Sequence, residues 1–246
     1  MTFRRQTYDR VVSLGQWCAT AIALKKLGLR SCSGPFDWTG LNESVGHYAE
    51  LIANGFEGFM EKGNLRKLRE DPVEGTEIYQ DSVQHWETHH EFKIGVPFEE
   101  NYAKYRALLD RRIARLLSNL RSGGKVLFVH WRGGGHYERK DVVDAACILR
   151  SAFPETTIDL LVLETEKFAK DVAYEELDQG VVVAIGDFYD VDRFGWVMGN
   201  EQLVLSVLRG IRVRGRWRNL LRLKTESISR RIKKHFTAKR NGQESA

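Results

Sequence analysis

The sequence predicts an α/β protein with a mainly parallel sheet of about four to six strands, flanked by helices. Four short apolar runs, at residues 11–14, 126–131, 158–163 and 181–185, are rich in β-branched side chains and lack alternating polar positions. Such runs are typical of strands that are buried on both faces. Amphipathic patterns separate several of these runs, and the strand–helix–strand order favours parallel pairing through right-handed crossovers.

The predicted helices follow from apolar spacing. An almost wholly apolar helix is expected at 16–27, directly after the first strand. Apolar side chains recur every three to four residues at 102–120 and at 141–153, which predicts two longer helices. Residues 31–101 lack either period and mix glycines, aromatic residues and polar residues. We therefore expect a helical and irregular insertion there, after the first strand–helix unit.

The charge distribution divides the chain into two parts. We predict a single α/β domain over residues 1–208 and a basic C-terminal extension over 209–246. The whole chain carries a net charge of +5, whereas residues 209–240 alone carry +12. Because Glu244 adds one negative charge, residues 1–208 carry −6. An attraction to an anionic partner therefore has to arise from the extension.

The pattern of apolar and basic residues in the extension predicts that one partner is a membrane surface. After an extended segment, a basic helix is expected over 218–236, and apolar side chains recur in this part of the chain about every four residues: Trp217, Leu221, Ile228, Ile232 and Phe236. Such a stripe between basic residues suits an anionic lipid surface. A solvated, partly disordered extension is the alternative. Binding of nucleic acid is not expected, because no recognition motif accompanies the charges.

The expected location is the cytoplasm, with contact to the inner face of the membrane through residues 209–240. No charge-free apolar run approaches the roughly 18 residues that a membrane span needs. The N-terminal residues lead into a short strand and not into the longer apolar stretch of a signal peptide.

Cys18 is the strongest candidate for a reactive group. The chain has three scattered cysteines, without the paired spacing of a zinc site or a disulfide framework. Gly15 and Gln16 follow the first strand, so Cys18 falls in the first turn of the next helix. Unpaired amides and the helix dipole stabilise a thiolate there, which lowers a cysteine pKa below its usual value of about 8.5. A buried cysteine that only packs is the alternative.

The segment QHWETHHEF supplies candidate bases, namely His85, His89 and His90. Imidazole exchanges protons near neutral pH. If the segment is a strand, His89 and His90 face opposite ways, and at most one reaches a given site. If it is a helix, His85 and His89 share a face and suggest a metal, but no third ligand is specified. A polar surface loop is a further alternative. We therefore predict neither a metal nor a cofactor.

The segment SLGQWCATAIALKKLGLRSCSGPFDW resembles the opening motif of a bacterial family of putative papain-like cysteine peptidases of uncharacterised function. That family has a strand that ends in Ser-Leu-Gly, with a Cys three residues further on. An apolar helix and then a Pro-Phe-Asp-Trp element follow. His90-Glu91-Phe92 resembles the family's His-Asp-Phe element, with Glu in place of Asp, and KVLFVHW resembles the strand after it.

The resemblance implies roles for particular residues. Cys18 is implied as the nucleophile, His90 as its base, and Asp37 as an orienting or binding residue. Gly15, Gln16 and Trp38 are expected to contact the substrate. We predict acyl transfer to water or to another acceptor, with an unknown small molecule, glycan or peptide as substrate.

Two further motifs suggest an alternative function. Arg132, Gly133 and Gly134 follow a predicted parallel strand, and their amides and guanidinium suit a phosphate, although a surface loop explains them equally well. Asp190 and Asp192 have the Asp-x-Asp spacing with which many nucleotide-sugar glycosyltransferases hold a divalent metal. Together they suggest a sugar-nucleotide-dependent transferase of the surface polysaccharide type. A non-catalytic, membrane-associated binding protein is the third hypothesis.

Overall fold

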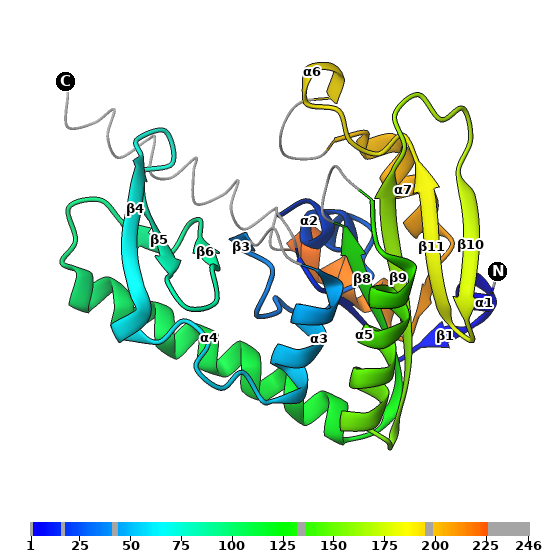
Figure 1. The fold of residues 1–246 in the computed structure, drawn as a ribbon, viewed down its shortest axis with the longest axis horizontal. Helices are drawn as coiled ribbons and strands as arrows, with labels where there is room; N and C mark the ends of the chain where they lie inside the picture. Colours follow the sequence, from blue (N-terminus) through cyan, green and yellow to red (C-terminus); the bar gives the residue numbers. More distant parts are fainter. Residues whose placement is uncertain (1, 16–17, 41–43, 132–135, 195–198, 226–246) are drawn as a thin grey trace.

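A five-stranded sheet in the order β10-β11-β9-β8-β2 forms the centre of the fold (Figure 1). The structure is a computed structural model, and it describes residues 2–15, 18–40, 44–131, 136–194 and 199–225. The strands of this main sheet are β2 (Arg10–Ser13), β8 (Gly124–Trp131), β9 (Thr156–Thr165), β10 (Ala173–Asp178) and β11 (Val181–Gly186). Four strands are parallel and β10 is antiparallel to β11. The expected mainly parallel sheet is therefore confirmed, with one antiparallel edge strand.

Each of the four apolar runs coincides with a strand of the main sheet, although Leu14 follows the last residue of β2. The central strands β8 and β9 are buried along almost their whole length, as their uniform apolar character predicts. The sequence did not reveal β10, because its residues AYEELD are charged and partly exposed. An edge strand of this kind carries no apolar signal.

Helices cover both faces of the main sheet. On one face, α1 (Thr2–Arg5), α2 (Cys18–Lys26) and α7 (Glu201–Arg209) pack on one side of β8 and β9. On the other face lie α3 (Val45–Ala53), α4 (Phe98–Arg121) and α5 (Arg139–Ala152). The helices expected at 16–27, 102–120 and 141–153 correspond to α2, α4 and α5. The short α6 (Val191–Phe194) follows β11.

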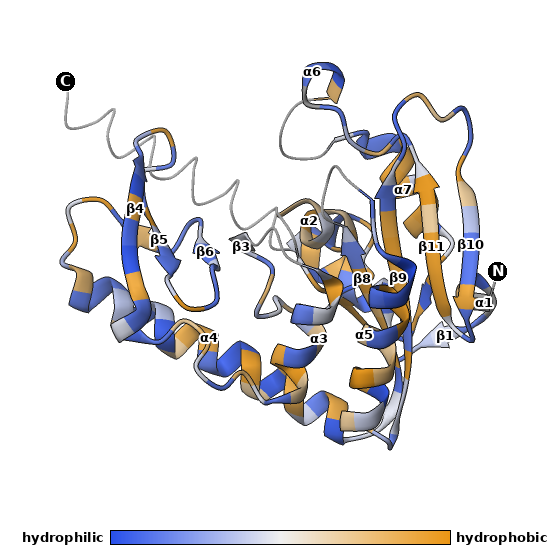
Figure 2. Ribbon diagram, in the orientation of Figure 1, coloured by the Kyte–Doolittle hydropathy of each residue, from blue (hydrophilic) through white to orange (hydrophobic). Residues whose placement is uncertain are grey.

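The region expected to be helical and irregular contains α3 but also a second sheet, which the prediction missed. Its antiparallel strands are β3 (Thr39–Gly40), β4 (Leu65–Asp71), β5 (Thr76–Asp81), β6 (Glu87–Thr88) and β7 (Phe92–Lys93), with the short 3-10 helix η1 (Lys62–Asn64) before β4. Strand β4 is mostly hydrophilic and exposed (Figure 2). Hairpin pairing with β5, and not apolar alternation, therefore defines this strand.

Helix α4 connects the two sheets. It runs beneath the second sheet and on to the main sheet (Figure 1). Tyr105 in its first half packs against Phe92 of β7, and Leu120 near its end joins the same apolar core as Val126 of β8. One continuous core therefore holds Phe92 of the second sheet in a fixed position relative to Val126 of the main sheet.

The described part of the C-terminal extension packs on the body of the protein. Strand β12 (Arg212–Val213) pairs in parallel with β1 (Thr7–Tyr8). Residues 216–225 are helical, and the Arg216 and Asn219 side chains donate hydrogen bonds to the carbonyls of Leu27 and Gly28, at 2.8 and 3.1 Å. Within the described residues, no helix has both the length and the apolar character needed to cross a membrane.

Candidate active site

Cys18 is the first residue of α2, at the carboxyl end of the edge strand β2. The connection begins at Gly15, whose φ of +75° favours glycine and whose missing Cβ would lie 3.2 Å from the Tyr48 ring. Ser13 Oγ accepts a hydrogen bond from the Gly15 N–H, and Thr20 Oγ1 donates one to the Gly15 carbonyl. These contacts fix the turn before the half-buried thiol. Gln16 lies outside the described residues.

His90 comes from the second sheet, between β6 and β7, and its Nε2 lies 3.6 Å from Cys18 Sγ. The residues that follow it are anchored to the core. Glu91 pairs with Arg112 of α4 at 3.4 Å, and the fully buried Phe92 packs between Tyr79 and Tyr105. The structure therefore brings together the two residues that the sequence predicted as nucleophile and base.

Two more side chains surround the imidazole. Trp38 meets His90 edge-on, with ring centroids 5.5 Å apart. Glu74 Oε2 lies 3.8 Å from His90 Nδ1, on the opposite side of the ring from the thiol. Sequence reasoning missed Glu74, because it occupies a polar turn between β4 and β5 without a recognisable motif. The thiol, the imidazole and the carboxylate thus stand in the order of a nucleophile, a base and a carboxylate that orients the base.

Burial raises the pKa of the Cys18 thiol to about 11, against the expectation from the sequence. A hydrogen bond from the backbone of Cys18 acts in the opposite direction, and the negative charge of Glu74 raises the pKa further. The effect of the helix terminus is thus present but smaller than the cost of removing a thiolate from water. The thiol is neutral at pH 7, so His90 has to accept its proton during attack.

His89 and His85 do not join this pair. His89 points toward β3, where its Nε2 lies 2.6 Å from the position that a Cβ on Gly40 would take, and burial lowers its pKa. His85 is exposed, with a φ of +60°, in the turn between β5 and β6. The helix with two histidines on one face is therefore not formed. No cluster of three or more potential metal ligands occurs among the described residues.

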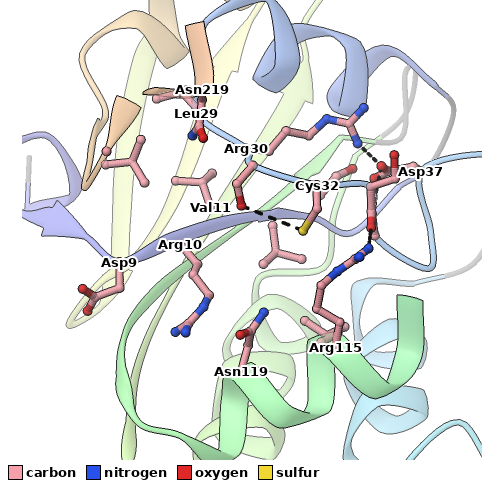
Figure 3. Close-up of a pocket in the computed structure, with 18 of the residues that line it drawn as sticks. Asp9, Arg10, Val11, Leu29, Arg30, Cys32, Asp37, Arg115, Asn119 and Asn219 are labelled. Carbon is pink, nitrogen blue, oxygen red and sulfur yellow. Dashed lines mark hydrogen bonds and ion pairs between the residues drawn. The ribbon is translucent and has the colours of Figure 1, made fainter. Parts of the chain in front are cut away.

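Asp37 is engaged by its own loop. Its carboxylate pairs with Arg30 and accepts the Gly34 N–H at 2.9 Å (Figure 3). Both Arg30 and Asp37 are buried. The pair therefore fixes the segment that holds Trp38 against the His90 ring. An orienting or substrate-binding role for Asp37 stays a prediction.

The transferase motifs receive little support from the structure. Arg132, Gly133 and Gly134 lie outside the described residues. Asp190 Oδ1 accepts the N–H groups of Asp192 and Arg193 at the start of α6. Arg193 pairs with Asp190 at 3.1 Å and with both carboxylate oxygens of Asp187 at 2.7 Å. These carboxylates therefore cap a helix and neutralise an arginine.

Comparison with known proteins identifies the family. Residues 9–148, which include Cys18, Trp38, Glu74 and His90, match the family described as "Putative papain-like cysteine peptidase (DUF1796)". The uncharacterized protein R408 of Acanthamoeba polyphaga mimivirus is 29% identical over 133 residues, which cover 48% of this chain and 59% of the viral protein. The chain thus spans about three fifths of the length of that relative. No solved structure matches the chain. Because the family match covers more than half of the sequence, the chain belongs to the putative papain-like cysteine peptidase family.

Proposed function

We propose that the protein is a thiol-dependent acyl-transfer enzyme with Cys18 as nucleophile and His90 as general base. The 3.6 Å contact between Sγ and Nε2 carries the proposal, because it joins residues 72 positions apart, one at the start of α2 beside the main sheet and one between two strands of the second sheet. A nucleophile within reach of a base, with the base oriented by a third group, is the arrangement that covalent catalysis requires.

The reaction proceeds through an acyl-enzyme. His90 Nε2 accepts the proton of the Cys18 thiol while Sγ bonds to the carbonyl carbon of the substrate. The tetrahedral intermediate then expels its amine or alcohol, which takes the proton back from His90 and leaves a thioester on Cys18. Water or another acceptor attacks this thioester, and its proton passes through His90 to the released thiol. Hydrolysis and acyl transfer differ only in the second acceptor.

The surroundings of the pair support this chemistry. The first amides of α2 have no partner within the helix and stabilise the negative oxygen of the intermediate. Glu74 stabilises the positive imidazolium from the Nδ1 side, 3.8 Å away. Trp38 limits the orientation of the ring through its edge contact. Together with Gly15 and Gln16, Trp38 is a proposed substrate contact.

Acetylation of the protein by p-nitrophenyl acetate tests the proposal. We expect one acetyl group on Cys18, located by peptide mass spectrometry, and its release over time. Cys18→Ala removes this acetylation, and His90→Gln slows it by at least a hundredfold, since a general base contributes about 10²–10⁴. Cys147→Ser is the matched control, because this exposed thiol lies on α5. Unchanged acetylation of His90→Gln would refute the proposal.

A second candidate role, contact with an anionic membrane surface on the cytoplasmic side, rests on the helical segment 216–225. Trp217 and Leu221 are 61% and 52% exposed and stand four residues apart on this segment. They line an apolar groove that also includes Lys25 and Lys224. Large apolar side chains beside lysines suit the boundary between lipid tails and acidic headgroups.

Flotation with vesicles tests this second role. Vesicles of phosphatidylcholine with phosphatidylserine are expected to carry the full chain to the top of the gradient, and high salt is expected to weaken this binding. Trp217→Ala together with Leu221→Ala should abolish flotation. Val83→Ala, in an exposed turn of the second sheet, should have no effect. Equal flotation of all three proteins would contradict the role.

A further inference from the structure

We propose that a second pocket, lined by β2, α4 and the segment after α2, binds the phosphate group of a small ligand. The pocket has a volume of about 160 Å³. Figure 3 draws residues that line it. Neither Cys18 nor His90 lines it, so the proposal is independent of the acyl-transfer function.

The lining of this pocket carries an excess of positive charge. It contains the aspartates Asp9 and Asp37 and six arginines: Arg10, Arg30, Arg112, Arg115, Arg214 and Arg218. Asp37 neutralises Arg30, and Asp9 pairs with Arg214 at 2.7 Å. Arg112 pairs with Glu91, which stands outside the lining.

Three arginines are left without a carboxylate partner among the described residues: Arg10, Arg115 and Arg218. They come from an edge strand, from the long helix and from the C-terminal helical segment. Arg115 donates one hydrogen bond to the Ser33 carbonyl at 2.5 Å, and its side chain makes no other hydrogen bond within the described part of the chain. Each guanidinium offers several N–H donors in a plane, the geometry that suits the oxygens of a phosphate.

Neutral donors face the same space. Asn119 lies one helical turn after Arg115 on α4, and its carboxamide faces the side of the pocket that Arg10 occupies (Figure 3). A doubly charged phosphate in this pocket would balance most of the charge of the three arginines. A phosphate therefore fits better than a single carboxylate.

Nearby positive charges add to the effect of burial on two arginines of the lining. Burial lowers the pKa of Arg30 to about 10; the nearby Cys32 acts in the opposite direction, and the positive charges of Arg112 and Arg222 lower the pKa further. The pKa of Arg112 is lowered by burial, and Arg115 contributes to the shift. A bound anion would relieve this repulsion between partly buried cations.

The size of the pocket restricts the ligand. Pockets for drug-sized molecules usually enclose about 300–1,000 Å³, which is more than the volume found here. A phosphate ion or the phosphate of a small ester fits this space. We expect a small phosphorylated metabolite and not a polymer.

Cys32 provides a direct readout, because its exposed thiol lines the pocket. The test is the rate of Cys32 alkylation by neutral iodoacetamide in the full-length protein, measured by peptide mass spectrometry. Glycerol phosphate should slow this rate at least fivefold in a saturable manner, and sodium chloride at equal ionic strength should not. Cys147 on α5 is the internal control, whose rate should stay the same.

Charge-removing variants complete the test. Arg10→Gln and Arg115→Gln should each raise the concentration for half-protection at least tenfold, while the control Arg66→Gln on exposed β4 should not. Thermal unfolding provides a second readout, since a ligand raises the Tm only if it binds the folded state. Inorganic phosphate and glycerol phosphate are then compared. If both give half-protection at the same concentration, the ligand is the phosphate ion. If inorganic phosphate needs a higher concentration than glycerol phosphate, the ligand is a phosphate ester. Equal protection by chloride, or unchanged protection of Arg10→Gln, would overturn the proposal.

Discussion

Cys18 experiences two opposing effects on its charge. Its place at the start of α2 favours a thiolate, and its burial beside Glu74 disfavours one. Burial is the larger effect, so the pKa rises to about 11. In the proposed reaction, the proton of this thiol passes to His90, 3.6 Å away, when a substrate is attacked. A thiol of this kind is protected from adventitious oxidation, because the thiolate is the form that oxidants attack.

The raised pKa predicts slow alkylation of Cys18 at neutral pH. At pH 8 an ordinary thiol with a pKa of about 8.5 is partly ionised. A thiol with a pKa of about 11 then holds roughly two hundredfold less thiolate. The rate of iodoacetamide labelling should therefore keep rising above pH 9 without a plateau. Glu74→Gln should shift the profile to lower pH, since the negative charge of Glu74 raises this pKa.

Glu70→Gln is the matched control, because Glu70 lies in the neighbouring strand β4 and pairs with Lys67. Its profile should coincide with that of the unaltered protein. A labelling midpoint below pH 8 would contradict the dominance of burial.

The segment between β6 and β7 shows how short elements position His90, the proposed base. Strand β7 has only two residues, yet Phe92 is fully buried and contacts aromatic rings from β5 and α4. Asn101 reinforces it through hydrogen bonds with the N–H and carbonyl of Lys93. Packing, and not the length of the strand, therefore holds His90 at Cys18.

Phe92→Ala should destabilise the protein by about 3–5 kcal/mol, the usual cost of removing a buried aromatic ring. Denaturant unfolding measures this loss. Acetylation of Cys18 should also slow under conditions where the variant is folded, because His90 loses its anchored neighbour. Phe168→Ala is the control, since this ring is 74% exposed and should cost less than about 1 kcal/mol. Equal losses in the two variants would refute the argument.

At the scale of the whole molecule, the N-terminal residues and the described C-terminal residues pack against each other. Strand β12 pairs with β1, and Ile211 is fully buried in the core beneath α2 and α7. The helical segment 216–225 then lies against Gly28 at the end of α2. The described part of the basic extension is thus attached to the element that carries Cys18.

Gly28 tests this attachment. It has a φ of +65°, and a Cβ there would lie 2.6 Å from Leu220 Cγ. Gly28→Ala should therefore cost about 1–2 kcal/mol in backbone strain, with a further loss from the collision. In a Leu220→Ala background the further loss should disappear, as a double-mutant cycle of unfolding free energies would show. Gly55→Ala is the control for strain alone, because its φ is +74° and nothing lies within 4 Å.

The amino-acid sequence determined four strands of the main sheet and the three helices α2, α4 and α5. The runs in β2, β8, β9 and β11 are apolar enough to require burial on both faces, and helix α4 shows its period over many turns. Both signals are local, so they can be found without a structure. The same holds for Cys18, because a strand, a glycine and a helix start follow within a few residues.

The tertiary structure decided what depends on contacts between distant segments. The second sheet is defined by hairpin pairing of charged strands, which leaves no apolar period in β4. The pKa of Cys18 depends on burial that neighbouring residues in sequence do not reveal. Glu74 meets His90 through the pairing of strands within the second sheet, and His90 meets Cys18 because the two sheets share one core. The arginine pocket likewise joins β2, α4 and the C-terminal segment. Local patterns fix which segments become strands and helices, whereas the distances between side chains arise only when those segments pack together.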